Sequence, residues 1–464
     1  MSRTALVTGA TGAIGSRLVP ALLDAGWHVR VLSRSPGKLD GTWRNRVEVT
    51  EGDAADPDVL RRALDGAEVA YYLLHSMNAD GDFVERDRRL ARGFAAAASA
   101  AGVGRLVYLG GLHPDGELSP HLASRVEVGK ILLESGVPTA VLQAGVVLGA
   151  GSASFAMLRH LTERLPVMVG PKWLQNRIQP IALDDAVHYL VRAAELPPEV
   201  NRTIDIGMGE ILTYAEMMQR YARIAGLTPR LVATVPVLTP WLASHWVGLV
   251  TPVAAGVAKP LVGSLIHEAV RRDDDAAALL GDPAGGLLGY EEAVRRALIG
   301  TDPKRWSHTM AKVGAAVAAC AVVGSVATAP DSGWYRRLQK PSWQPLPAAF
   351  PLVWTSLYAA ITVAATATIA ELEDQGRDAD AAAFWQALMA NLALNTGWSV
   401  VFFRLHRLPL ATVWSALLAV SSTDLARRAA ATGRGKAVAL GAYAGWTVFA
   451  TALSGTVARR NPRR

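Results

Sequence analysis

The chain has one cysteine, Cys320, among 464 residues. A single cysteine can form no disulfide within the chain and cannot build a cysteine-based metal site. The amino-terminal residues also lack the apolar stretch of a secretory signal, because they lead directly into a short apolar run and a glycine-rich turn. We therefore expect no disulfide framework, no metal centre and a first domain that stays in the cytoplasm.

Charged residues are scarce, at 19%, while hydrophobic residues reach 51%, against typical values of about 25% and about 45–50%. The imbalance is concentrated after Lys312, where long apolar runs begin, whereas the chain before residue 230 has the pattern of a water-soluble protein. The formal net charge is +7, and arginines cluster beside the apolar runs and in the carboxy-terminal tail. That placement is typical of charges that flank membrane spans, and no nucleic-acid-binding motif accompanies it.

The first residues carry a strand, a glycine-rich turn and a helix in sequence. An apolar run at 4–8 precedes the turn, a helical pattern covers 16–25, and a second strand is predicted at 28–33. Glycines in such a turn allow the backbone to approach a pyrophosphate, whose charge then lies at a helix N-terminus. The expected cofactor-binding residues of the turn are Gly9, Thr11, Gly12, Ala13, Ile14 and Gly15.

Further strands are predicted at 47–50 and 68–74, near 106–109 and at 139–143, alternating with helices. This alternation predicts an α/β fold with a doubly wound, parallel, Rossmann-like sheet. Arg34, rather than an acid, follows the second strand and favours NADP, although NAD remains possible. Asp53 is placed to reach the adenine, and Leu74 ends the fourth strand at the expected cofactor crevice.

The motifs TGATGAIG at 8–15, Gly52-Asp53 and YLGGL at 108–112 resemble atypical short-chain dehydrogenases/reductases of the NmrA-like and epimerase-like kind, over residues 1–300. Active members of that superfamily use a serine and a Tyr-x-x-x-Lys pair for proton transfer. In this chain Val126 precedes Lys130 by four residues, and the serine position falls at Gly110-Gly111. The resemblance therefore assigns no catalytic residue, and the possible substitutes are Tyr71, Tyr72, Tyr108 and His113.

Residues 231–258 contain no charged side chain but are interrupted by prolines. Proline disfavours a continuous helix, so this stretch is interpreted as an apolar lid or a membrane-apposed segment rather than a span. An amphipathic helical pattern returns at 266–299, and residues 301–309 are expected to form a linker.

Five apolar segments follow, at about 310–329, 349–370, 382–403, 408–426 and 437–457. Each is close to the roughly 20 residues that cross a bilayer as a helix. Eight of the 13 tryptophans lie at position 306 or later. Tryptophan is frequent at membrane interfaces. The pattern therefore predicts an all-α transmembrane bundle of five helices in contact with the lipid bilayer.

The order of the tryptophan motifs is more specific than their number. The stretches around Trp334, Trp354, Trp398 and Trp446 resemble the TspO/MBR family of tryptophan-rich sensory proteins, over residues 310–462. The resemblance implies a pocket for porphyrins or other lipophiles and a possible homodimer. By motif, the pocket residues would be Trp343, Trp354, Asn395, Trp398 and Trp446. Asn395 is either a ligand contact or a helix-packing residue, and both readings stay open.

The leading hypothesis is a multi-pass, membrane-anchored NAD(P)-binding protein that recognises a tetrapyrrole or similar lipophile, in the role of a redox-linked sensor or handler. One alternative is an NADPH-dependent oxidoreductase for a lipophilic substrate. Another is a lipophile transporter or scaffold with a vestigial nucleotide fold. The lysines and arginines that flank the two ends of the spans nearly balance, so they do not orient the carboxy-terminus.

Overall fold

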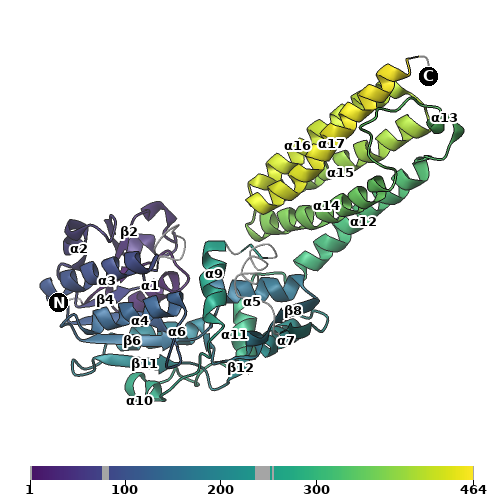
Figure 1. Ribbon diagram of the computed structural model, residues 1–464. Coiled ribbons are helices and arrows are strands. Elements are labelled where there is room, and N and C mark those ends of the chain that lie inside the picture. Colours follow the sequence, from purple (N-terminus) through teal and green to yellow (C-terminus); the bar gives the residue numbers. More distant parts are fainter. Residues whose placement is uncertain (1–2, 76–82, 236–250, 253–254, 463–464) are drawn as a thin grey trace. The chain divides into compact units, whose positions relative to one another are not determined.

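The computed structural model describes residues 3–75, 83–235, 251–252 and 255–462. The chain forms two compact units, Met1–Gly300 and Thr301–Arg464 (Figure 1). Each unit has its own core, and each is described separately below.

The first unit is built on a seven-stranded sheet with the order β11-β6-β5-β4-β1-β2-β3. All its strand pairs are parallel. The prediction of a doubly wound parallel sheet is therefore confirmed, with β11 added at one edge. The strands are β1 (Thr4–Thr8), β2 (His28–Ser33), β3 (Glu48–Glu51), β4 (Val69–Tyr72), β5 (Arg105–Gly111), β6 (Thr139–Ala144) and β11 (Arg202–Ile206).

Helices cover both faces of this sheet. The core on one face includes α1 (Gly15–Asp24) and α6 (Leu183–Ala193). The core on the other face includes α2 (Pro57–Leu64), α3 (Phe83–Ala100) and α4 (Pro120–Leu133). A parallel sheet needs apolar residues on both faces, and the fully buried central strand β4, with the sequence VAYY, meets that requirement. The chain reverses its winding between β1 and β4, which is the point where doubly wound folds bind ligands.

A second core lies beyond β6. Its helices are α5 (Ala153–Arg164), α7 (Tyr214–Ile224), α9 (Ala255–Ser264) and α11 (Tyr290–Ala297). Short strands join them, namely β7 (Val147–Leu148), β8 (Val167–Pro171), β9 (Arg177–Ile178), β10 (Ile181–Ala182), β12 (Leu212–Thr213) and β13 (Leu231–Val235), while α10 (Ala276–Leu280) packs with the first core.

The structure adds detail to two stretches of this part. The charge-free stretch at 231–258 begins as strand β13 and ends in α9, and its residues 236–250 and 253–254 lie outside the described part of the chain. The amphipathic pattern at 266–299 contains two short helices, α10 and α11. Glycines with positive φ separate these helices, among them Gly281, which directly follows α10.

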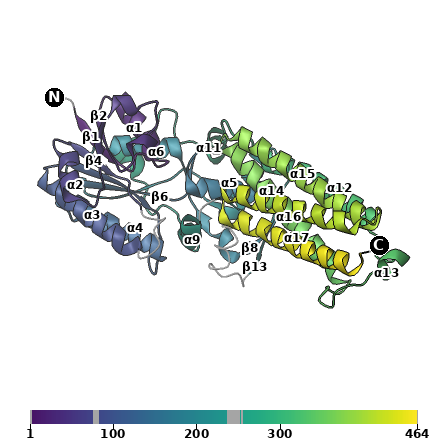
Figure 2. The same ribbon diagram turned by 90° about the horizontal axis from the view of Figure 1, so that it is seen from above.

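The second unit consists of five long helices and the short α13 (Gly333–Arg336). The long helices run side by side in both views (Figures 1 and 2). They are α12 (Arg305–Ala327), α14 (Ala349–Asp374), α15 (Asp378–Phe403), α16 (Leu408–Ala430) and α17 (Arg434–Arg460). The expected linker at 301–309 is shorter than predicted because α12 already begins at Arg305, and the other helices extend past the apolar segments through charged ends.

Four of these helices, α12, α14, α16 and α17, are long and apolar enough to cross a membrane. The predicted third span, α15, does not meet that criterion among the described residues. Part of the reason is polarity inside the bundle, because α15 contributes the buried Asn391 and Asn395. The expectation of a membrane-spanning helical unit is confirmed, and the count of spans established by length and composition is four.

A buried hydrogen-bond network joins four of the long helices through α15. Tyr358 of α14 donates to Asn395 Oδ1 at 3.0 Å, and Asn395 Nδ2 donates to the hydroxyl of Tyr443 in α17 at 3.1 Å. The Tyr443 hydroxyl in turn donates to Asn391 Oδ1 at 2.9 Å. Asn391 Nδ2 then donates to Ser422 of α16 at 3.0 Å. Polar groups buried away from water need such partners, so the network explains how α15 carries two asparagines.

Candidate cofactor and substrate site

The glycine-rich turn after β1 has the shape of an anion cradle. Gly9 has φ +69°, and a Cβ there would lie 2.6 Å from the carbonyl oxygen of Leu73. A Cβ on Gly15 would lie 2.4 Å from Gly9 O, so neither position has room for a side chain. Helix α1 then begins without a side-chain cap and without an acid in its first turn. Its free amides and positive dipole end suit a pyrophosphate.

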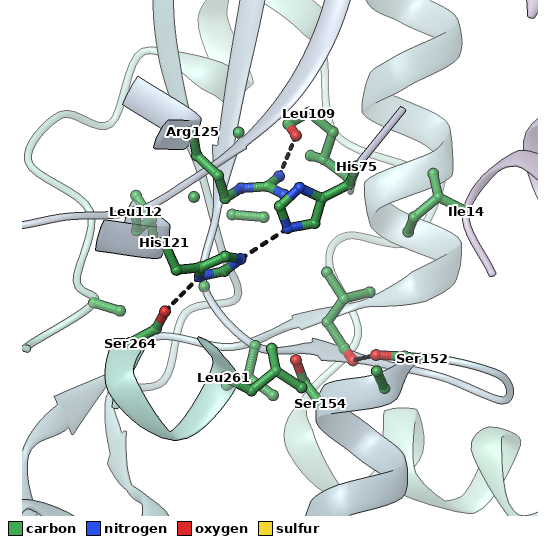
Figure 3. Close-up of a pocket in the computed structure, with 18 of the residues that line it drawn as sticks. Ile14, His75, Leu109, Leu112, His121, Arg125, Ser152, Ser154, Leu261 and Ser264 are labelled. Carbon is green, nitrogen blue, oxygen red and sulfur yellow. Dashed lines mark hydrogen bonds between the residues drawn. The ribbon is translucent and has the colours of Figure 1, made fainter. Parts of the chain in front are cut away.

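A cavity of about 300 Å³ opens from this turn. Its walls come from the ends of β4, β5 and β6 and from α4 and α9, and most of the lining is apolar. The polar side chains at its surface include His75, His121, Arg125, Ser264 and His267 (Figure 3 shows the first four). The same cavity therefore combines a phosphate cradle with an apolar chamber and titratable groups.

The predicted cofactor residues divide into three sets. Most of them line the cavity, namely Gly9, Gly12, Ala13, Ile14, Gly15 and Leu74. Thr11 lines a neighbouring cavity, which shares Gly12 and Ala13 with the first. Arg34 and Asp53 lie beyond β2 and β3 as an exposed ion pair, with Nη1 and Oδ2 separated by 3.8 Å.

A pair of histidines forms the most polar part of the cavity wall (Figure 3). His75, just after β4, and His121, in the first turn of α4, approach with their Nε2 atoms 2.8 Å apart. On the outer side of His75, Nδ1 lies 3.2 Å from Oδ2 of the buried Asp87. On the outer side of His121, Nδ1 lies 2.7 Å from the hydroxyl of Ser264 in α9.

The surroundings disfavour positive charge on this pair. Burial lowers the pKa of His75 below its usual value, against the opposing effect of Asp87. Burial, assisted by the charge of Arg125 and by His75, lowers the pKa of His121 to about 3. Arg125 lies one helical turn after His121, and its guanidinium donates to the carbonyl of Leu109. The pair is therefore neutral or holds a proton only weakly at neutral pH.

The residues that the sequence places at the Tyr-x-x-x-Lys positions do not lie in this cavity. Val126 and Lys130 are absent from its lining, and Lys130 points to solvent, where it pairs with Glu134 at 3.8 Å. His121 and Arg125 have the same four-residue spacing and both line the cavity. That spacing is the available signal in the sequence, but its residues are histidine and arginine rather than tyrosine and lysine.

The suggested substitutes for a catalytic tyrosine are buried or bonded to the backbone. Tyr71 and Tyr72 are buried in β4, and burial raises the pKa of both. Tyr108 lines the cavity, but its hydroxyl is directed to the backbone oxygen of Arg125 at 3.4 Å and burial raises its pKa. His113 bonds to the carbonyl of Pro114 outside the lining.

The predicted membrane pocket residues fall into two aromatic groups. Trp343 and Trp446 both contact the ring of Phe449, with centroid distances of 5.8 and 5.1 Å. Trp354 and Trp446 pack against the same core cluster, which includes Tyr443. Trp398 belongs to a different cluster, in which it stacks on Phe402 at 5.2 Å.

Asn395 lies inside the bundle with its side chain fully engaged. Its oxygen accepts from Tyr358, and its nitrogen donates to Tyr443. Of the two readings left open by the sequence, these contacts favour the helix-packing role. Among the described residues, no group of three or more His, Cys, Asp or Glu side chains is placed to hold a metal ion.

Comparisons with known proteins agree with this division of the chain. Residues 9–136 match the NAD(P)H-binding family, and residues 313–460 match the TspO/MBR family. A ceramide reductase of Caulobacter vibrioides is 32% identical over 240 residues, which are 49% of this chain and 72% of that protein. A tryptophan-rich sensory protein of Cereibacter sphaeroides is 39% identical over 137 residues, which are 29% of this chain and 80% of that protein.

Solved structures resemble the first unit in fold. The crystal structure of the Citrobacter sp. triphenylmethane reductase complexed with NADP(H) matches with a TM-score of 0.50 at 20% identity, covering 64% of this chain and all of that one. At that identity the likeness shows the fold alone. The chain thus belongs to the NAD(P)H-binding family in its first unit and to the TspO/MBR family in its second, and is an integral membrane protein that binds a nicotinamide cofactor.

Proposed function

We propose that the first unit is an NAD(P)H-dependent oxidoreductase for a lipophilic carbonyl compound or alcohol, held at the membrane by the second unit. One observation carries the proposal. The cavity that starts at the glycine turn continues into an apolar chamber whose wall holds His75, His121 and Arg125. A protein that only senses the cofactor has no need for titratable groups in the adjoining chamber.

Two further facts support a lipophilic substrate. Leu261 of α9 and Leu265, the residue after that helix, line the chamber, and the charge-free stretch at 231–258 ends within α9. The relative from Caulobacter vibrioides is named a reductase of ceramide, which is a lipid. An apolar wall with a few polar groups is the usual design of a site for such ligands.

The experiment is NADPH and NADH oxidation by the purified full chain in detergent, with a panel of lipophilic ketones, quinones, isoprenoids and porphyrins. We expect turnover with at least one of them. The control is Gly12→Asp, because a Cβ at Gly12 meets only Gly9 O at 3.3 Å and the added carboxylate would enter the phosphate site. That variant should keep its melting temperature and lose both cofactor binding and turnover. Binding without turnover across the panel would instead support the sensor hypothesis.

We also propose that NADP is preferred over NAD. Arg34 is exposed at the end of β2, where the adenosine ribose is held in this fold, and its ion pair with Asp53 is long at 3.8 Å. The guanidinium can exchange that partner for a 2′-phosphate. Arg34→Ala should weaken NADPH binding about 10- to 100-fold, in line with about 1.5–3 kcal/mol for a hydrogen bond to a charged group, and leave NADH binding unchanged. Calorimetry with both cofactors measures this difference.

For the second unit we propose a porphyrin-like or other lipophilic ligand held by Trp343, Trp354 and Trp446, with α15 as a fifth span and a homodimer formed through this unit. The aromatic contacts of these tryptophans support the ligand, because flat rings stack on a macrocycle. Protoporphyrin should quench tryptophan fluorescence of the wild type. Quenching unchanged in the Trp354→Leu, Trp446→Leu double variant would overturn this part.

The cofactor also requires the first unit to face the cytoplasm, where NADPH is available. A cysteine-free variant carrying a single new cysteine at exposed Ser35 should resist a membrane-impermeant thiol reagent in intact cells and react after lysis. The transporter or scaffold reading predicts no cofactor binding and no effect of Gly12→Asp.

A further inference from the structure

The histidine pair contains a countable set of hydrogens. An N···N contact of 2.8 Å between two imidazoles holds one hydrogen between the rings. Ser264 has one hydroxyl hydrogen, and it is directed to the carbonyl of Pro260 at 3.1 Å. With the hydroxyl hydrogen so directed, the 2.7 Å contact between Ser264 and His121 Nδ1 places a hydrogen on that ring.

The count of hydrogens also determines which nitrogens of His75 are protonated. Its Nδ1 donates to the carboxylate of Asp87, so both outer ring nitrogens of the pair carry hydrogens. When the pair takes up a proton, the hydrogen shared between the rings gives it one positive charge, which the carboxylate of Asp87 balances. Loss of that proton leaves two neutral rings. The full set of contacts thus accommodates one transferable proton at the cavity wall.

Opposing interactions keep this proton loosely held. Burial and the cation of Arg125 disfavour it, whereas the carboxylate of Asp87 favours it. Among the described residues, the charged and titratable groups around the pair are Asp87 from α3, Arg125 from α4 and His267 beyond α9. His267 lines the cavity and accepts from the backbone amide of Ser119 at 3.1 Å. A weakly held proton is readily passed to a substrate oxygen, which is the step that acid catalysis requires.

We propose that His75 and His121 are the proton-transfer pair of the oxidoreductase, giving the shared proton to the oxygen of a lipophilic ketone and taking it back from the alcohol. This inference rests on the proposed function. A bound reduced nicotinamide supplies the hydride for the reduction. The carbonyl carbon gains a C–H bond, and the C=O π pair moves to oxygen. The oxygen then takes the proton from Nε2, so that one N–H bond breaks and one O–H bond forms. The pair becomes neutral, and water returns one proton.

Arg125 contributes to the same proton transfer through its charge. Its guanidinium is fixed by the carbonyl of Leu109 and lies 5.8 Å from the ring centroid of Tyr108. There it provides a fixed positive charge where the alkoxide develops. It is a positioning residue for charge, while the two imidazoles transfer the proton.

The activity test uses His121→Gln, with His188→Gln as the matched control because His188 is a half-buried histidine outside the cavity, bonded to the carbonyl of Gly281. His121→Gln should lower kcat by about 10²–10⁴-fold with NADPH affinity unchanged, and His188→Gln should change neither. His121→Tyr should retain part of the activity with its pH profile moved to the alkaline side, since a phenol ionises near pH 10. Wild-type kcat in His121→Gln would overturn the inference.

A second readout needs no turnover and separates this inference from the proposed function. Nitrogen-15 histidine NMR of the full chain in nanodiscs, assigned with single Gln variants, should show His75 and His121 titrating as one coupled unit. Replacing His121 should then shift the His75 signals. Unchanged His75 signals in His121→Gln would overturn the pair even if the enzyme is active. A coupled pair in a chain that turns over no substrate would count against the oxidoreductase alone.

Discussion

Removal of one hydroxyl, in Tyr443→Phe, tests what holds the membrane unit together. The side chain of Tyr443 is completely buried, and its hydroxyl joins Asn395, at 3.1 Å, to Asn391, at 2.9 Å. The substitution keeps the ring and its packing. It removes one acceptor and one donor from the centre of a network that links α14, α15, α16 and α17.

The expected loss follows from those two bonds. Hydrogen bonds between membrane helices average about 0.6 kcal/mol, with a maximum near 1.7, whereas leaving a buried polar group unpaired costs about 1–3 kcal/mol. Because both asparagines keep other partners, we expect Tyr443→Phe to lower the free energy of unfolding by about 1–3 kcal/mol.

The assay is unfolding of the full chain in detergent, followed by tryptophan fluorescence as the SDS fraction is raised. Tyr335→Phe is the matched control, since that hydroxyl only accepts from Gln344 at 3.4 Å and its loss should change stability by less than about 0.5 kcal/mol. Equal stability in the two variants would refute the view that the network supports the bundle.

Three further predictions follow from close contacts and burial. Gly15→Ala would place a Cβ 2.4 Å from Gly9 O, so we expect the first unit to lose about 1–3 kcal/mol and NADPH binding to be lost, as calorimetry and thermal melting would show; an unchanged melting temperature would contradict this. Gly397→Ala would bring a Cβ within 2.6 Å of the ring of Trp414 and should lower the free energy of unfolding in SDS by about 1–3 kcal/mol. The control is Gly441→Ala, where the added Cβ meets no atom and stability should not change. Burial lowers the pKa of His121 to about 3 in the folded chain, so its contribution to stability is complete above about pH 6.5 and is lost as the pH falls towards 3. The melting temperature should therefore fall less steeply between pH 7 and pH 5 in His121→Gln than in the wild type. Identical slopes would disprove this.

Local chemistry alone was enough to predict the two-part organisation. A glycine turn between a strand and a helix indicates a phosphate cradle because few other backbones fit that pattern, and Gly9, Gly12 and Gly15 do line the cavity. Apolar runs of span length indicate membrane helices because the bilayer sets their length. Their ends were less well predicted, since charged residues extend α14 and α17 beyond the apolar runs.

The predicted α15 span shows the limit of hydropathy. Its asparagines are acceptable inside the bundle only because Tyr358 and Tyr443, far away in the sequence, supply their partners. A hydropathy average includes the polarity of Asn395 but not its hydrogen-bond partners. The role of that residue therefore stays open until the tertiary contacts are known.

The sequence by itself determined that a nucleotide cradle and a tryptophan-rich membrane unit share one chain, because each feature depends on short, contiguous motifs. Only the tertiary structure decided which side chains lie beside the cradle. His75, His121 and Ser264 come from three separate segments, and no local pattern brings them together. Their contacts exist because the parallel sheet aligns the end of β4 with the start of α4, and because α9 packs against that helix.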